Sequence, residues 1–237
     1  MEPLPKLPPP IKRPTGLKLL RIWRQRFREG LLTVLLVVQI FILFIMPAVR
    51  ASGVPIPQIA ITIVLLTFVS LAIALSRSRI AIVTLVVSVI LTIIGLIWSS
   101  TEPNLLTDSV AALGQVLSQL SLLGAVASAV FGPGRITYHR ILGAIVMYLG
   151  IGMIFTSLDM LLVRTIPNAF THLPTNPIEL REALTYFGFG TLTTGSFGDI
   201  APLHPIARSL SNLESICGQL FPATLLARIV SLHGTSK

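Results

Sequence analysis

The stretch Thr191-Leu192-Thr193-Thr194-Gly195-Ser196-Phe197-Gly198-Asp199 decides the fold of this chain. It follows a short helix-like run, Pro177 to Gly190, and precedes a long apolar run, Leu203 to Leu232. The order is therefore a short helix, a Thr/Gly loop, an aspartate and a helix long enough to span a membrane. Irregular backbone at membrane depth is tolerated only where it is buried in protein or lines a water-filled path. This order predicts a re-entrant loop that lines such a path.

The composition of the whole chain is that of a membrane protein. Of its 237 residues, 53% are hydrophobic and only 11% are charged, whereas about 25% of the residues of a soluble domain are charged. Uncharged runs of about 18 residues or more recur, and each can cross roughly 30 Å of hydrocarbon. We therefore expect several helical spans.

The net charge of +9 can suggest nucleic-acid binding, but the distribution of the charge argues against it. Eight of the eighteen Lys and Arg residues fall within the first 28 positions, and most of the others lie in short connectors. This is the positive-inside pattern of a multi-pass membrane protein. No nucleic-acid partner is expected. The single Cys217 excludes an intrachain disulfide.

Six apolar runs are long enough to span the membrane, and the Lys/Arg-rich connectors between them all fall on one side. Both termini are therefore expected to be cytosolic. The first run is too long for the core of a signal peptide, which has about 7–15 residues, so we expect it to be retained. The runs are Leu31–Val49, Ile59–Leu75, Ile80–Trp98, Ser109–Phe131, Ile141–Val163 and Leu203–Leu232.

The N-terminal region has two parts. Residues 1–15 are Pro-rich and lack apolar periodicity, which predicts a disordered cytosolic arm. In residues 16–30, Leu20, Trp23 and Phe27 follow helical spacing among basic residues. This pattern predicts a basic interfacial helix against anionic lipid. A calmodulin-type or other partner site is an alternative from the same pattern.

The short helix is predicted to begin at Asn176 and to end at about Gly190 or Leu192. Asn176 is a good N-cap, Pro177 suits the first turn, and Glu179 completes a near capping box. About 15 residues reach only about 22 Å, so the helix cannot span the bilayer. It must enter and stop, which directs its negative C-terminal dipole at the membrane centre.

The loop resembles the selectivity filter of the potassium-channel pore-loop superfamily, written T-x-T-T-V-G-Y-G-D. The resemblance covers about residues 139 to 235. Five positions match the signature, Phe197 replaces its Tyr, and Gly195-Ser196 stands where Val-Gly is usual. The matching residues are Thr191, Thr193, Thr194, Gly198 and Asp199.

The resemblance implies an all-α membrane protein with six transmembrane helices plus one re-entrant pore helix and filter loop per chain. One filter strand per chain implies a homotetramer. The implied regions are residues 1–30, a cytosolic Pro-rich arm and basic interfacial helix; 31–131, a four-helix sensor-like domain; and 139–237, a pore domain of outer helix, pore helix, filter and inner helix.

The resemblance also assigns roles to residues of the loop and of the last helix. Rings of carbonyl oxygens replace the hydration shell of potassium in such filters. The implied filter is Thr194, Gly195, Ser196, Phe197 and Gly198, with potassium at the first four. The implied filter support and outer mouth are Thr193, Asp199 and Glu214, and the implied gating hinge is Gly218 with Pro222.

The Gly195-Ser196 change leaves three outcomes open. The family has glycine with positive φ where Ser196 stands, and left-handed geometry costs an L-residue about 1–2 kcal/mol. Ser196 accepts this strain, or Gly195 lets the path shift, or the filter becomes less rigid and less selective. Gly198 keeps its positive-φ position. Phe197 keeps the packing of the usual Tyr and loses a hydrogen bond of about 0.5–1.5 kcal/mol.

Two residues of the last helix have structural alternatives. Gly218 is either a gating hinge or a site of close helix packing. Glu214 is expensive in lipid, so we expect it to face protein behind the filter. Pro222 removes a backbone hydrogen bond and is expected to kink the helix.

The expected function is a tetrameric channel passing potassium passively, with no catalysis and no cofactor besides permeant potassium ions. Ser109–Phe131 contains no Lys or Arg, so voltage sensing by this span is not expected. The alternatives are a weakly selective monovalent cation channel and a non-conducting regulatory membrane subunit. The expected location is the plasma membrane, in particular a bacterial inner membrane. Lipid, pH through His139 or His233, tension or a partner remain open as the gating stimulus.

Overall fold

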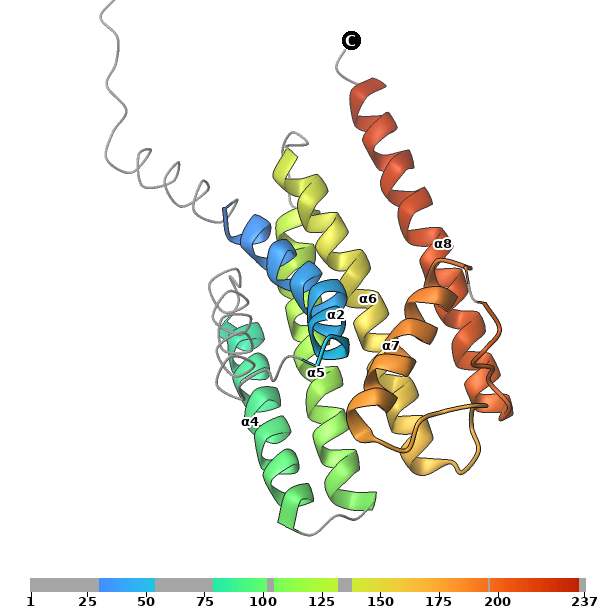
Figure 1. Cartoon of the computed structure of the whole chain (residues 1–237). Helices are drawn as coiled ribbons and strands as arrows, with labels where there is room; N and C mark the ends of the chain where they lie inside the picture. Colours follow the sequence, from blue (N-terminus) through green and yellow to red (C-terminus); the bar gives the residue numbers. More distant parts are fainter. Residues whose placement is uncertain (1–29, 54–78, 102–104, 132–137, 196, 235–237) are drawn as a thin grey trace, which may run out of the picture.

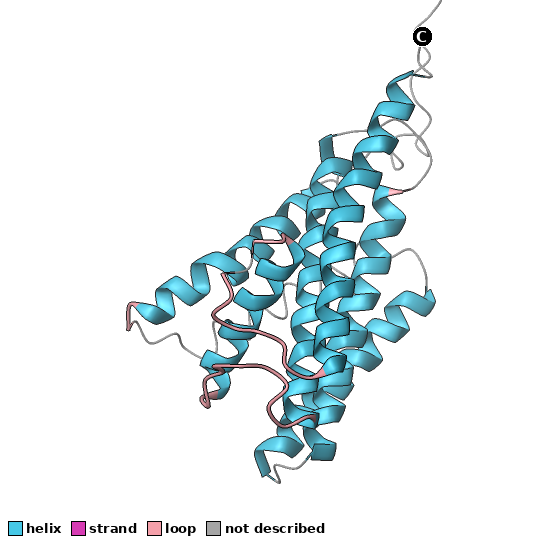
Figure 2. Cartoon of the chain, turned by 90° about the vertical axis from the view of Figure 1, so that its right-hand side faces the viewer, coloured by secondary structure: helices cyan, strands magenta, loops and turns pink. Residues whose placement is uncertain are grey.

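The computed structural model describes residues 30–53, 79–101, 105–131, 138–195 and 197–234. Within these ranges the elements of secondary structure are helices, joined by turns and loops and accompanied by one isolated β-bridge (Figure 2). The expected all-α class is therefore confirmed for the described residues. The predicted arm and interfacial helix up to residue 29, the predicted span Ile59–Leu75 and Ser196 lie outside the described residues.

The helices follow the order of the predicted spans (Figure 1). The first runs from residue 30 through a π-helical turn η1 and into α2. The boundaries are η1 Phe41–Ile45, α2 Met46–Ala51, α4 Arg79–Thr101, α5 Leu105–Val130, α6 Tyr138–Thr165, α7 Pro177–Leu192 and α8 Pro205–Gly234.

Two helical segments among the described residues are long and apolar enough to cross a membrane. They are Gly30–Ala51 and Arg140–Thr165, and two shorter apolar segments are Ile82–Gly95 and Ala112–Ser128. This supports a membrane location by length and composition. The expected count of six spans remains a prediction.

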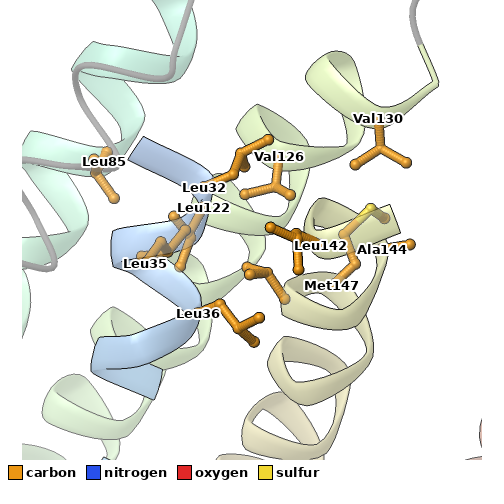
Figure 3. Packing of buried hydrophobic residues seen from close by; sticks show 11 residues of the cluster. Leu32, Leu35, Leu36, Leu85, Leu122, Val126, Val130, Leu142, Ala144 and Met147 are labelled. Atoms are coloured by element: carbon orange, nitrogen blue, oxygen red, sulfur yellow. The ribbon is translucent and has the colours of Figure 1, made fainter. Parts of the chain in front are cut away.

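The first helix, α4, α5 and α6 meet in one apolar core (Figure 3). Leu35 and Val126 have no exposed surface at its centre, and Leu85 reaches it from α4. Phe221 of α8 packs against the same core and stacks on Tyr148, with ring centroids 6.0 Å apart. In lipid such packing stabilises through close contacts between side chains rather than through exclusion of water.

Helix α5 carries three neighbouring polar residues, Gln115, Ser118 and Gln119, and this polar face is partly buried. Gln119 is buried and lines a small cavity against α6, where its Oε1 atom has no hydrogen-bond partner among the described residues. The Ser118 hydroxyl donates to the carbonyl of Gln115 on the same helix, at 2.8 Å. Of these three residues, Gln119 is the one that packs inside the bundle, as expected of an amide that lipid cannot satisfy.

The second part of the fold is built from α6, α7 and α8, with α7 packed against both long helices (Figure 1). The loop before α7 pairs with the segment that precedes α8. Thr171 N–H donates to Ala201 O at 2.9 Å, and Leu203 N–H donates to Ala169 O at 2.8 Å. These bonds tie the exit of the Thr/Gly loop to the segment that leads into α7.

Two polar contacts connect the first part of the chain to the second. Arg50, in the last turn of α2, forms an ion pair with Glu182 of α7 at 3.2 Å. Arg228 of α8 donates to the carbonyl of Phe131, just past the end of α5, at 3.1 Å, and its guanidinium lies 4.8 Å from the centroid of that ring.

Helices α4 and α5 approach each other closely at Gly114. A Cβ atom built there would lie 2.7 Å from both N and Oγ1 of Thr92. We predict that Gly114→Ala lowers the free energy of unfolding in detergent by about 1–3 kcal/mol, because it overpacks this contact. Gly124→Ala, on the same helix with no neighbour within 4 Å of its built Cβ, is the matched control. Equal unfolding curves for the two variants would contradict the prediction.

Candidate functional site

The short helix α7 begins as predicted. The Asn176 side chain accepts a hydrogen bond from the backbone N–H of Ile178 at 2.9 Å, and Pro177 occupies the first helical position. The helix has 16 residues, which corresponds to about 24 Å. It therefore ends before it can cross a bilayer, and its end lies between α6 and α8.

The C-terminal end of α7 is closed by a Schellman-type cap. Thr194 N–H donates to Thr191 O at 3.0 Å and Gly195 N–H donates to Gly190 O at 2.8 Å. Thr194 carries the left-handed conformation that such a cap requires, with φ of 59°. A filter strand of the implied kind is extended from Thr194 to Gly198, and at Thr194 this structure differs because the residue is left-handed. The reason is local: the last helical carbonyls find their donors in the first residues of the loop.

Beyond the cap, the loop is exposed and returns along the surface of α7. Gly198 has φ of 81°, as its place in the signature predicts. A Cβ atom built on Gly195 would meet only the Thr193 hydroxyl, at 3.6 Å. There is therefore room for a side chain at position 195. Ser196 lies outside the described residues, so the strain expected there stays a prediction.

Tyr186 of α7 holds the outer half of the loop. The rings of Tyr186 and Phe197 stack with an interplanar angle of 3° and centroids 6.1 Å apart. The Tyr186 hydroxyl also donates to the Asp199 carboxylate at 3.4 Å. A single side chain of α7 thus contacts both Phe197 and Asp199. This geometry favours a role for Asp199 in bracing the loop against α7.

The exit of the Thr/Gly loop also contacts the loop that precedes α7. Nδ1 of His172 lies 3.1 Å from the carbonyl oxygen of Asp199. The Thr193 hydroxyl, at the other end of the loop, donates back to Phe189 O at 2.7 Å. The described loop residues are therefore tied to α7 at the inner end and to both α7 and the outer loop at the exit.

Helix α8 contacts the end of α7 through two residues one turn apart. The Ser215 hydroxyl donates to Thr191 O at 3.2 Å. A Cβ atom on Gly218 would overlap the carbonyl oxygen of Leu192. Gly218 is thus a site of close packing against the end of α7, and its role as a gating hinge remains a prediction. Helix α8 continues through Pro222 to Gly234.

Glu214 faces protein, as expected, where α6, α7 and α8 meet. Its side chain is fully buried, and a Cβ atom on Gly188 of α7 would lie 3.3 Å from its Oε1 and 3.1 Å from Oγ1 of Thr156 on α6. Asp159, one turn after Thr156, is also buried. The Glu214 side chain therefore points from α8 toward α7 and is shielded from the surface of the protein.

Sequence reasoning missed three residues of this site. Tyr186, Ser215 and Asp159 act through partners that are distant in the chain, so no local pattern marks them. Two weak signals exist. Tyr186 is an aromatic residue on the helix that immediately precedes an aromatic filter position, and Asp159 is an acid inside an apolar run, which is expensive unless it faces protein.

The contact at Gly218 gives a prediction about its role. Gly218→Ala is expected to lower the free energy of unfolding by about 1–3 kcal/mol, because the new methyl group displaces α8 from the Leu192 carbonyl. The measurement is detergent unfolding of the purified protein. Gly150→Ala on α6, where a Cβ would make ordinary contacts at 3.6 and 3.8 Å, is the control. If Gly218 serves only as a hinge, its variant will unfold like the control.

No family model, curated protein or solved structure matches this chain. The function of the site is therefore inferred from its own residues and geometry.

Proposed function

We propose that this chain is one subunit of a tetrameric membrane channel that passes potassium passively, without voltage sensing by its fourth predicted span. The observation that carries the proposal is the half-length helix α7, which stops between two long helices and leads directly into the Thr/Gly loop. A helix that ends inside a membrane protein is tolerated where irregular backbone lines a cavity. The signature residues of the loop supply the chemistry of a filter.

The proposed mechanism uses the dipole of α7 and the carbonyl oxygens of the loop. Four α7 C-termini, each equivalent to roughly half a negative charge, favour a cation at the inner end of the loop. Carbonyl oxygens from Thr194, Gly195, Ser196 and Phe197 of four chains replace its hydration shell. Tyr186 and His172 hold the exit of the loop through their contacts with Asp199.

One observation favours the second candidate, a non-conducting regulatory subunit. Thr194 is left-handed, and the N–H groups of Thr194 and Gly195 are engaged in the helix cap. An extended filter strand requires Thr194 to leave this conformation and to release the cap. In a regulatory subunit the cap stays in place and the chain modulates a conducting partner. A weakly selective cation channel is the intermediate case, in which the loop conducts along a less rigid path.

The location and the partners follow from the same proposal. The protein lies in a plasma membrane, such as a bacterial inner membrane, as a multi-pass homotetramer with cytosolic termini. Anionic lipid binds the basic residues 16–30. The chain needs no catalytic residue and no cofactor beyond the permeant potassium ions.

The decisive experiment is a reversal potential in planar bilayers with potassium on one side and sodium on the other. For the native chain we predict a reversal shifted toward the potassium equilibrium value, by about 59 mV for each tenfold preference. The double variant G195V/S196G restores the usual filter residues and should increase this shift. Position 195 has room for a side chain beside the Thr193 hydroxyl, and glycine removes the strain expected at position 196. Gly124→Val, on α5 and away from the loop, should leave the shift unchanged.

The outcomes separate the three functions. Robust current that reverses near zero in the native chain, with a shift restored in G195V/S196G, identifies a weakly selective channel. No native current from an intact tetramer, together with current in the double variant, identifies a regulatory subunit. No current from either form, with the tetramer intact in both, contradicts the proposed filter.

A further inference from the structure

Two buried glutamines interrupt the apolar core that the first helix forms with α5 and α6. Leu35 and Leu36 belong to the buried stripe of the first helix, and Gln39 stands one turn later on the same stripe. On α5, Gln119 lies one turn before Leu122 of the same core. Gln39 is 0% exposed and Gln119 is 8% exposed. Each helix therefore places an amide where the pattern calls for an apolar side chain.

The two amides have polar atoms that need partners. Both the oxygen and the nitrogen of the Gln39 amide, and Oε1 of Gln119, have no hydrogen-bond partner among the described residues. A buried amide without hydrogen bonds is strongly unfavourable, and the hydrocarbon of a bilayer supplies none. Buried polar atoms of this kind are satisfied by protein or by ordered water.

The two amides converge on one small cavity. Gln119 lines this cavity together with Gly150 of α6. The Nε2 atom of Gln39 lies 3.8 Å from a Cβ atom built on the same Gly150. The glycine therefore leaves space between the two amides that a side chain on α6 would otherwise fill.

The three residues form one layer of the helix bundle. The chain runs in the same direction along the first helix and α6, and in the opposite direction along α5 (Figure 1). Gln39 and Gly150 each follow a core residue by three positions, and Gln119 precedes one by three positions. These core residues are Leu36, Met147 and Leu122, all labelled in Figure 3. The amides and the glycine thus lie at the same level, one turn from the apolar core.

The size and the lining of the cavity select its occupant. Its volume is about 10 Å³ for the centre of a water molecule, and one water needs about 10–15 Å³ by this measure. No charged side chain is among the lining residues, so an ion is disfavoured there. Besides Gln119 and Gly150, the lining residues are Leu122, Leu123, Val126 and Val146.

We propose that one water molecule occupies this cavity and bridges the amides of Gln39 and Gln119, which links the first helix to α5 beside Gly150. Each amide carries a donor and an acceptor. The water can therefore accept from one amide and donate to the other whichever way either amide is turned. Buried waters make about three hydrogen bonds, and the three unpartnered atoms of the two glutamines can supply them.

The bridging water fixes the first helix along its axis. A shift of this helix by one turn, about 5.4 Å, takes Gln39 out of the layer of Gln119 and leaves both amides among apolar side chains. Lipid gives no hydrophobic drive that selects one alignment of apolar helices. A buried polar layer makes this selection, as a buried asparagine does in a coiled coil.

The first test is solid-state NMR of the full chain in lipid bilayers with ¹⁵N-labelled glutamine side chains. Magnetisation from water protons passes at short mixing times only to amides that have water as a neighbour. We expect transfer to both Gln39 and Gln119 in the native chain, and loss of each signal in Gln39→Leu or Gln119→Leu assigns it. Absence of transfer at either amide overturns the proposal, because a water between them adjoins both. A dry cavity and a direct bond between the glutamines both give this result.

The same experiment on variants separates one bridging water from unrelated hydration. In Gln119→Leu the transfer to Gln39 should fall by at least half, because the water loses one of its two anchors. The matched control is Gln115→Leu, the same change one turn earlier on α5 and outside the cavity lining. It should leave the transfer to Gln39 at its native level. Equal transfer to Gln39 in Gln119→Leu and in the control overturns the proposal.

The second test is thermal unfolding in detergent of Gln39→Leu, Gln119→Leu and the double variant. Each single variant should lower the Tm by roughly 2–10 °C, because it leaves the water and the other amide without a partner. The double variant should be at least as stable as either single variant, because it leaves no amide in the apolar layer. Additive losses in the double variant overturn the proposal. The NMR result for the native chain holds even if a variant does not fold.

Both tests are independent of conduction. If bilayer recordings show no potassium current while water transfer reaches both amides, the bridging water stands and the channel function fails. If current is present and the transfer is absent, the channel function stands and the bridging water is refuted.

Discussion

The end of α7 imposes the constraint on which the rest of the site depends, because a helix that stops inside protein leaves its last carbonyl groups to be satisfied by something else. Here the loop supplies donors to Gly190 and Thr191, and α8 supplies the Ser215 hydroxyl to Thr191. Thr191 O therefore accepts from both the loop and α8. A movement of α8 cannot leave the loop unaffected, since both share this acceptor.

Three glycines permit this arrangement, one on each helix of the junction. A Cβ at Gly152 of α6 would lie 2.8 Å from ring atoms of Phe189, one at Gly188 of α7 would crowd Thr156, and one at Gly218 of α8 would overlap the Leu192 carbonyl. Small residues let helices approach where lipid gives no hydrophobic drive to associate. The same closeness of the three helices also buries Asp159 and Glu214.

The sequence predicted the features that depend on neighbouring residues. Asn176-Pro177 marks the start of α7, the limited length of the run marks its failure to span, and a signature glycine marks the positive φ of Gly198. The sequence did not predict the left-handed Thr194, because that conformation depends on which donors reach the α7 carbonyls. It also did not predict that Asp159 is buried as Glu214 is, because the burial of each acid depends on which helices pack against its own.

The first helices are held to α7 and α8 mainly through packing, and the magnitudes of the two polar contacts show why. The pair Arg50–Glu182 is about 30% exposed on each side (29% and 32%), and such pairs contribute about 0–1 kcal/mol. Arg228 gains about 0.3–1 kcal/mol at the C-terminal end of α5 and about 0.5–1 kcal/mol over the Phe131 ring. By contrast, Phe221 joins α8 to a core in which Leu35 and Val126 are fully buried, and loss of one large core side chain costs about 2–5 kcal/mol. The apolar core therefore contributes more than the polar contacts to holding the first helices against α8.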